Sequence, residues 1–197
     1  MERRALSPAF FFGTAWAYDF YMTVTTLMTA DELLRMPRDG WRYQLVEGEL
    51  QKMSPSGWEH IRVAAQIIGS LTTFLKSHPI GFVGASEGGF IIARNPDTVL
   101  APDAVFVSAE RNIDTSAFFD GPPDVAFEVV SPSDRYTEVE EKTMRWLNGG
   151  VRAVVIVDPR NRTVRVHRSS GITKISDTLS VDDVIPGWSL PLSEIFT

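Results

Sequence analysis

Two carboxylates stand in segments whose other residues predict buried strands. Asp103 follows Pro102 at the start of the apolar run APDAVFV, and Glu128 interrupts the run DVAFEVV. A carboxylate in apolar surroundings is costly unless it is protonated, paired with a cation or bound to a metal. If the two strands are neighbours, the acids converge at one edge of a sheet. A divalent cation there would relieve their repulsion and create a Lewis-acid site.

Each acid taken alone also has an ordinary explanation. An aspartate that follows proline at a strand start is common turn chemistry, and a single acid near a strand end is usually solvated. The pair of acids is more informative than either one, and the helix predicted after Glu128 adds a cation to them. The metal-site hypothesis therefore depends on whether that cation faces the same edge.

Lys142 is the cation that the sequence places nearest to this edge. In YTEVEEKTMRWL it lies three residues after Val139 and four before Trp146, on or beside the stripe predicted to be buried. From there its ammonium can reach back over the strand end, where it would orient a water or stabilise charge on a phosphate oxygen. Alternatively, Lys142 extends outward and pairs with Glu138. Spacing alone leaves both arrangements open.

Composition restricts the class of protein and the kind of metal site. The chain has 197 residues, enough for one domain, and a net charge of −6, so nucleic acid would have to bind a local patch. It has no cysteine and three histidines, which excludes disulfides and thiolate ligands and argues against a zinc site. Oxygen ligands favour Mg²⁺ or Mn²⁺. We expect a cytoplasmic protein without a small-molecule cofactor.

The hydrophobic pattern predicts an α/β fold, a mixed central sheet flanked by helices in a single domain. A capping box formed by Thr29 and Glu32 begins a short helix that Pro37 ends, and a hairpin turns at Glu47-Gly48. Longer helices are expected at 57–77 and 135–148, and the segment 124–158 reads as a right-handed strand-helix-strand crossover. Strands are expected at 81–86, 89–94, 101–108, 124–130, 152–159, 162–168 and 172–175, with the C-terminal remainder irregular.

The first residues differ from the rest of the chain. We expect residues 1–26 to be an extension, the product of a start codon assigned too early with Met22 or Met28 as the real start, and residues 27–197 to form the domain. Export is the alternative, since AWA resembles a signal-peptidase site, but Pro8 and Gly13 interrupt the apolar run. No segment reaches the roughly 18 apolar residues of a membrane span, so no membrane contact is expected.

Secondary candidates lie on the first long helix and on a late strand. His60 is a candidate phosphate contact or proton carrier, and a surface histidine is the alternative. RNRTVRVHR contains four arginines, which either bind phosphates or protect an edge strand from aggregation. They are Arg160, Arg162, Arg165 and Arg168.

The motifs together are similar to one family. PDAVFV, PDVAFEVVSPSDR, EVEEK and GVRAVVIVDP, with MTADELL, RYQLVEGEL and VIPGWSLPLSEIF, resemble the Uma family of endonucleases, within the PD-(D/E)xK, restriction-endonuclease-like superfamily. The resemblance extends from Leu27 to the C-terminus. It implies a restriction-endonuclease-like mixed sheet that carries a metal-dependent phosphodiesterase site.

The same resemblance assigns roles to residues. Asp103 matches the metal-binding aspartate and Glu128 the second acid, and the Val129 carbonyl is a third candidate ligand. The usual lysine position, two residues after Glu128, holds Val130. Lys142, on the following helix, is the matching lysine.

A second departure from the family lies in the first hairpin. Relatives tend to have an acid where this chain has Gln44, which would weaken the site if that acid supports it. Glu49 and Glu87 are the candidate auxiliary acids.

The resemblance and the acid pattern favour a Mg²⁺-dependent endonuclease that acts on DNA. A weakened nuclease fold that binds nucleic acid or a protein without cutting is the second hypothesis. The third is a structural or regulatory partner. Dimerisation through the hairpin and the tryptophan-bearing surfaces is expected under that third hypothesis, and a homodimer is compatible with the first two.

Overall fold

The computed structural model describes residues 26–37, 39–86, 88–111 and 117–197. The helices are α1 (Ala30–Leu34), α2 (Trp58–Ser77), α3 (Tyr136–Asn148) and α4 (Leu192–Ile195). The strands are β1 (Arg42–Val46), β2 (Glu49–Met53), β3 (Gly81–Ala85), β4 (Phe90–Ala93), β5 (Thr98–Leu100), β6 (Ala104–Ser108), β7 (Phe119–Asp120), β8 (Val125–Val129), β9 (Ala153–Asp158), β10 (Thr163–Arg168), β11 (Gly171–Ile175), β12 (Thr178–Ser180) and β13 (Ser189–Pro191).

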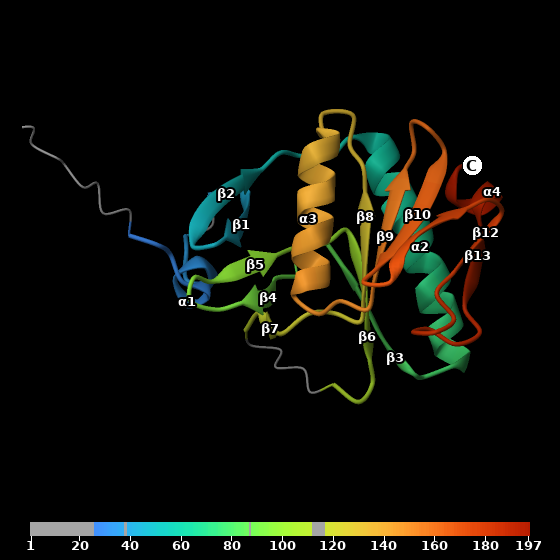
Figure 1. The fold of residues 1–197 in the computed structure, drawn as a ribbon, viewed down its shortest axis with the longest axis horizontal. Coiled ribbons are helices and arrows are strands. Elements are labelled where there is room, and N and C mark those ends of the chain that lie inside the picture. Colours follow the sequence, from blue (N-terminus) through green and yellow to red (C-terminus); the bar gives the residue numbers. More distant parts are fainter. Residues whose placement is uncertain (1–25, 38, 87, 112–116) are drawn as a thin grey trace, which may run out of the picture.

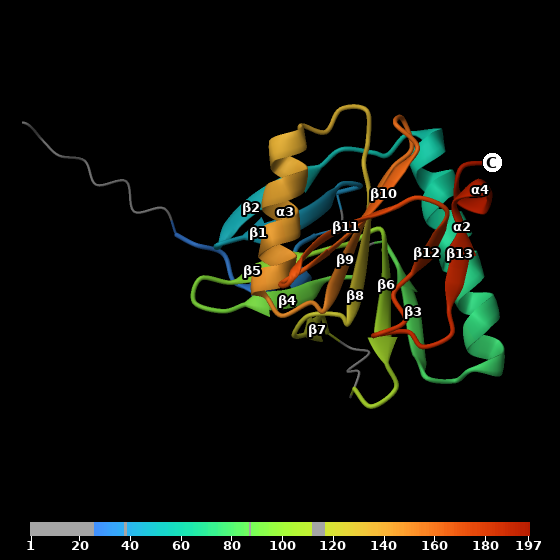
Figure 2. The same ribbon diagram turned by 45° about the vertical axis from the view of Figure 1, so that its right-hand side comes forward.

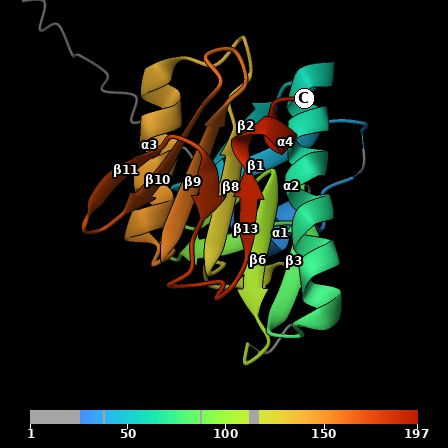
Figure 3. The same ribbon diagram turned by 90° about the vertical axis from the view of Figure 1, so that its right-hand side faces the viewer.

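A six-stranded mixed sheet forms the centre of the fold, in the order β11-β10-β9-β8-β6-β3. β8 and β9 are parallel and are joined through α3, while β6 runs antiparallel to β8 on its other side. Figure 3 shows this sheet with α3 on one side and α2 on the other. The parallel strand-helix-strand unit predicted at 124–158 is therefore confirmed.

A second sheet, in the order β2-β1-β5-β4-β7, extends the fold beside α3 (Figure 1). β1 and β2 form a hairpin whose turn residues Glu47 and Gly48 both have positive φ, as a tight two-residue hairpin turn requires. The short strands β12 and β13 pair with each other and lie near α2 and α4 (Figure 2).

The two faces of β8 bury different sets of side chains. Val125, Phe127 and Val129 pack in a core with α2 and the C-terminal segment, whereas Ala126 packs in a second core that includes Trp146 of α3. Because side chains alternate along a strand, Glu128 shares the face of Ala126 and is directed toward α3. The alternation of the strand thus decides which helix meets the carboxylate.

The expected α/β fold is confirmed, although its β structure is divided between separate sheets. The helices at 57–77 and 135–148, the capping box at Thr29 and the hairpin at Glu47-Gly48 are all observed. The expectation of an irregular C-terminal segment was wrong, because β12, β13 and α4 lie there, and β5 and β7 were also missed. These elements have two to four residues each, too few to give a periodic pattern, and packing against their neighbours maintains them.

Two sequence expectations concern residues outside the described part of the chain. The N-terminal extension at 1–26 lies there except for its last residue, so the boundary at 27 stays a prediction, and Glu87 lies there as well. None of the described helices combines the length and the hydrophobicity that a transmembrane segment needs.

The Gly48 position predicts an unequal effect of two glycine substitutions. Gly48 and Gly40 both have positive φ, but a Cβ on Gly48 would lie 2.6 Å from the Leu27 Cβ, while one on Gly40 meets nothing within 4 Å. We expect Gly48→Ala to lower the free energy of unfolding by at least about 1 kcal/mol more than Gly40→Ala. Urea unfolding of both variants measures the difference, and equal losses would contradict the packing argument.

Candidate active site

Asp103 and Glu128 lie on neighbouring strands at one edge of the six-stranded sheet. Ala104 pairs with Phe127 in the β6–β8 ladder, which places the residues before and after them side by side. The Asp103 N–H donates to the Phe127 carbonyl at 3.1 Å, and the Val129 N–H donates to Asp103 Oδ2 at 2.8 Å. The expected convergence of the two acids at one sheet edge is thus observed.

Glu128 is held by two donors from α3. Lys142 Nζ lies 2.7 Å from Glu128 Oε2 and also donates to the Ala101 carbonyl at 3.2 Å. Trp146 Nε1 donates to Glu128 Oε1 at 2.7 Å. Lys142 and Trp146 are four residues apart, so one face of α3 supplies both donors.

The alternative arrangement for Lys142, outward pairing with Glu138, was wrong. Glu138 instead accepts from the Arg135 N–H and forms the capping box at the beginning of α3. On the exposed side of the same helix, Glu141 pairs with Arg145 at 3.5 Å. Lys142 turns inward because a buried carboxylate compensates its charge more strongly than an exposed one on the same helix.

Burial raises the pKa of the Glu128 carboxyl to about 7. The Lys142 ammonium opposes this shift, the negative charge of Asp103 reinforces it, and the hydrogen bonds from Lys142 and Trp146 oppose it further. Asp103 therefore lies within electrostatic reach of Glu128. A second cation in this cleft would favour the ionised form of Glu128.

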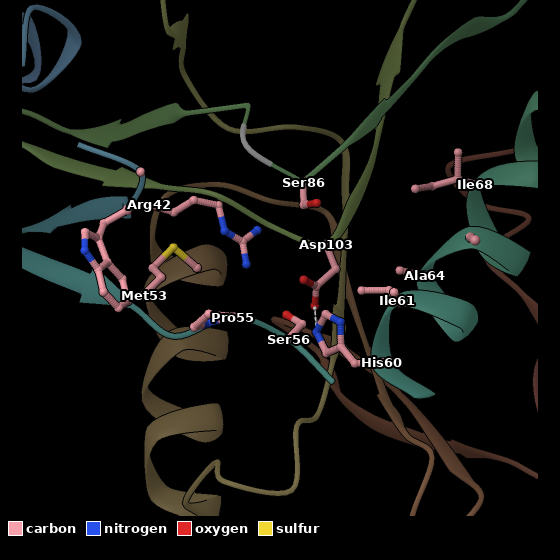
Figure 4. A pocket seen from close by; sticks show the side chains of 13 residues that line it. Arg42, Met53, Pro55, Ser56, His60, Ile61, Ala64, Ile68, Ser86 and Asp103 are labelled. Atoms are coloured by element: carbon pink, nitrogen blue, oxygen red, sulfur yellow. Dashed lines mark ion pairs between the residues drawn. The ribbon is translucent and has the colours of Figure 1, made fainter. Parts of the chain in front are cut away.

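The pKa of the Asp103 carboxyl is shifted in the opposite direction, to below its ordinary value. Burial acts to raise its pKa, but the His60 imidazole, the Lys142 charge and the Val129 N–H outweigh burial and hold that pKa below its ordinary value. His60 Nε2 lies 3.1 Å from Asp103 Oδ2, a contact drawn as a dashed line in Figure 4. The first turn of α2 thus brings His60 into contact with Asp103. Its expected role as a phosphate contact or proton carrier stays a prediction.

One cleft of about 780 Å³ lies between the β1–β2 hairpin, the edge of the six-stranded sheet and α3, and it is lined by His60, Asp103, Glu128 and Lys142 among others. Its acids slightly outnumber its cations. The acids are Asp103, Glu128, Asp134, Glu138 and Glu141, and the cations are Arg42, Lys52, Lys142 and Arg145.

The other predicted residues lie in different places. Glu49 is exposed on β2 and does not line this cleft. Arg165 forms an ion pair with Glu140 and Arg168 one with Asp183, whereas Arg160 and Arg162 are exposed. Phosphate binding by these arginines stays a prediction, and two of the four already form ion pairs within the chain.

Sequence reasoning missed several residues that line the cleft or contact its acids. Trp146 looked like an ordinary core tryptophan, and its role as a donor to Glu128 appears only when α3 packs against β8. Arg42 and Lys52 come from the distant hairpin, as does Gln44, which the departure from the family pattern had already singled out. The period of two in β1, which directs Arg42, Gln44 and Val46 to one face, was the signal that could have grouped two of them.

The donor set at this edge fits a hard divalent cation. Among the described donors, the Val129 N–H and His60 Nε2 both contact Oδ2 of Asp103 and not Oδ1. Gln44 Oε1 is buried in the cleft wall without a hydrogen-bond partner. No cluster of three or more acidic, histidine or cysteine side chains that could hold a metal occurs in the described ranges. Mg²⁺ does not need one, because it is usually bound by one or two carboxylates with waters and substrate phosphates.

Comparison with known proteins decides the family. Residues 30–193 match the family Uma2, described as "putative restriction endonuclease". The chain belongs to the Uma2 family. The resemblance to the Uma family is thereby confirmed.

Among the solved structures that match this Uma2-family protein, one covers most of the chain. It is the crystal structure of a "putative nuclease belonging to DUF820" from Anabaena variabilis ATCC 29413. The TM-score is 0.74 at 19% identity, over 86% of this chain and 97% of the other. The match shows that the two chains share one fold, and the expected α/β architecture of a mixed sheet flanked by helices is confirmed. The search of curated proteins found no match.

The raised pKa of Glu128 predicts a dependence of stability on pH. An unfolded glutamate ionises near its ordinary pKa of 4.5, and folded Glu128 only near 7, so ionisation of this group destabilises the metal-free protein as pH rises between these values. The free energy of unfolding of the wild type should therefore fall between about pH 5 and about pH 8. In Glu128→Gln this fall should be smaller, by up to about 3 kcal/mol.

Urea unfolding in EDTA at both pH values measures this difference. Glu138→Gln, which removes an exposed acid from the same helix, is the matched control and should follow the wild type. Asp103 does not contribute over this range, because its lowered pKa gives stability that is lost only at more acidic pH. Equal pH dependence in Glu128→Gln and wild type would show that the carboxyl titrates normally.

Proposed function

We propose that this Uma2-family protein hydrolyses phosphodiester bonds of DNA with Mg²⁺ or Mn²⁺ bound beside Asp103 and Glu128. One observation carries the proposal: two acids and Lys142, from β8, the start of β6 and α3, meet in a single cleft. A buried acid pair with an adjacent ammonium is expensive to maintain and suits charge stabilisation at a phosphate.

Asp103 and Glu128, with the Val129 carbonyl, are the residues that would hold the metal. When bound, the metal supplies a Lewis acid and lowers the pKa of a coordinated water. The side chains of the protein do the remaining work. Lys142 donates to the attacking water or to a phosphate oxygen, the Val129 N–H and His60 fix the orientation of Asp103, and Trp146 fixes that of Glu128. Water adds across the P–O bond, and the proton ends on the leaving oxygen.

A nucleic acid suits the cleft as substrate because Arg42 and Lys52 extend into it from the hairpin. The excess of acids would repel a polyanion, so the proposal makes substrate binding as well as cleavage dependent on a divalent cation. We propose DNA in keeping with the endonuclease family. Cytoplasmic location and a homodimer stay expectations from the sequence.

A nuclease fold that binds without cleaving is the second candidate. Gln44 favours it, because its buried carbonyl oxygen lies unpaired in the cleft where family members tend to have an acid. An amide is a weaker ligand for Mg²⁺ than a carboxylate, so this member would hold the metal less tightly.

The first test of the proposal is nicking of supercoiled plasmid DNA with Mg²⁺ or Mn²⁺. Asp103→Asn should lower the rate at least about 100-fold, because it removes a charged ligand without changing the shape of the side chain. Asp120→Asn, on an exposed aspartate of β7 that pairs with Arg94, is the matched control and should cut as the wild type does.

Two results would count against the hydrolase. Cutting by Asp103→Asn at the wild-type rate would assign the activity to a contaminant or to another site. A band shift of the plasmid without any product, in either metal, would favour the non-cleaving module.

Metal binding can be tested without activity, by thermal unfolding with and without Mg²⁺. Because Glu128 ionises near pH 7, Mg²⁺ should stabilise the wild type more at about pH 8 than at about pH 5. At a concentration about 100 times the Kd, the expected rise in Tm is roughly 5 to 10 °C. Glu128→Gln should lose most of this rise, and Gln44→Glu should increase it. A Tm that does not respond to Mg²⁺ at either pH would remove the metal from the site.

A further inference from the structure

A second hollow, of about 470 Å³, lies beside Asp103 between the hairpin and α2 (Figure 4). It shares Arg42, His60 and Asp103 with the larger cleft, so the two spaces meet at the carboxylate of the candidate active site. Its volume falls within the range of roughly 300 to 1,000 Å³ that holds small organic groups. We name it the hairpin pocket.

The walls of the hairpin pocket are mostly apolar. Most of its wall residues come from the hairpin side, Trp41, Met53 and Pro55, and from α2, Ile61, Ala64, Ala65 and Ile68. Trp41 and Ile61 are each 47% exposed, although large apolar side chains usually gain from burial. Two half-exposed apolar side chains on opposite walls of one hollow leave room for a flat apolar group between them.

Cations flank the aromatic wall. Lys52 Nζ lies 3.1 Å from the centre of the Trp41 ring and lines the larger cleft, so its charge is close to both spaces. The Arg42 side chain extends from the hairpin toward Asp103 (Figure 4). An aromatic ring with adjacent cations, next to a phosphodiester site, is the combination that binds single-stranded nucleic acids.

We propose that the hairpin pocket receives an unpaired nucleobase of the substrate, stacked near Trp41, while Arg42 and Lys52 contact the adjoining phosphates. This inference rests on the proposed function, since the base enters the pocket only when its backbone lies in the cleft. An apolar peptide would not require cations at the rim, so the charges favour a nucleotide.

The consequence is a preference for DNA that contains unpaired nucleotides. A base inside a duplex is stacked and paired, and it can enter a side pocket only after it is flipped out, whereas a base in a single strand, bulge or mismatch enters at little cost. Stacking tolerates every base, so the pocket selects for strand structure and not for sequence.

The test compares binding of a fluorescent single-stranded oligonucleotide and of the fully paired duplex of the same sequence, by anisotropy with Ca²⁺ in place of Mg²⁺. The wild type should bind the single strand more tightly. Trp41→Ala should weaken that binding about 5-fold to 100-fold, while duplex binding changes less than about 2-fold. Trp41→Phe, which keeps an aromatic ring, should retain most of the affinity.

Matched substitutions separate the pocket from general surface effects. Trp58→Ala removes an exposed tryptophan, 77% accessible, at the beginning of α2 and outside the pocket, and should change neither affinity. Ala65→Leu fills the pocket from an exposed helix position and should weaken single-strand binding, whereas Gln66→Leu, one residue further and outside it, should not. Thermal unfolding verifies that each variant is folded.

Several results would overturn the assignment. They are equal binding of both DNA forms by the wild type, equal losses in Trp41→Ala and Trp58→Ala, or equal losses in Ala65→Leu and Gln66→Leu. A change of self-association in Trp41→Ala by sedimentation, without a change in DNA binding, would give the pocket to a second copy of the chain.

The two proposals fail in different ways. Metal-dependent nicking, together with single-strand binding that Trp41→Ala leaves unchanged, would retain the nuclease and remove the base pocket. Single-strand binding that depends on Trp41, in a protein that cuts no DNA, would retain the pocket and remove the hydrolase.

Discussion

The architecture of the site depends on how the buried carboxylate of Glu128 is compensated by hydrogen-bond donors. Its side chain is about 10% exposed, and a carboxylate so placed is costly unless donors replace the lost water. Lys142 and Trp146 supply those donors, one to each oxygen, and both belong to α3. The same two contacts fasten α3 to the end of β8. Removal of either donor would leave part of a buried charge without compensation, so the site and the helix-sheet packing are energetically inseparable.

The remaining features of the cleft follow from this junction. The β8–α3–β9 crossover brings Lys142 back over the strand end, and the antiparallel β6 places Asp103 beside Glu128. α2 closes one side with His60, and the hairpin faces it with Arg42 and Lys52. The cleft is thus bounded by regular elements, which suits a site whose charges must be held in fixed geometry before a substrate binds.

The departures from the family pattern also have a structural reading. Val130, at the usual lysine position, packs partly buried against the second core, and the ammonium arrives from Lys142 on the helix instead. Gln44 occupies the cleft wall through the alternation of β1, with its carbonyl oxygen unpaired. The first change retains the charge by another route, whereas the second lowers the negative charge available to a cation.

The sequence by itself determined the elements with strong local patterns and the identity of the acids. The capping box at Thr29, the long helices and the buried strand around Glu128 follow from periodicity and capping, which act over a few residues. An acid within an apolar run marked Glu128, because burial of a charge requires compensation. The tertiary structure alone decided which partner compensates it, since Lys142 had two carboxylates within reach. It alone also revealed the Trp146 bond, the strands of two or three residues and the pocket beside Trp41. These depend on contacts between distant segments, which no local pattern records.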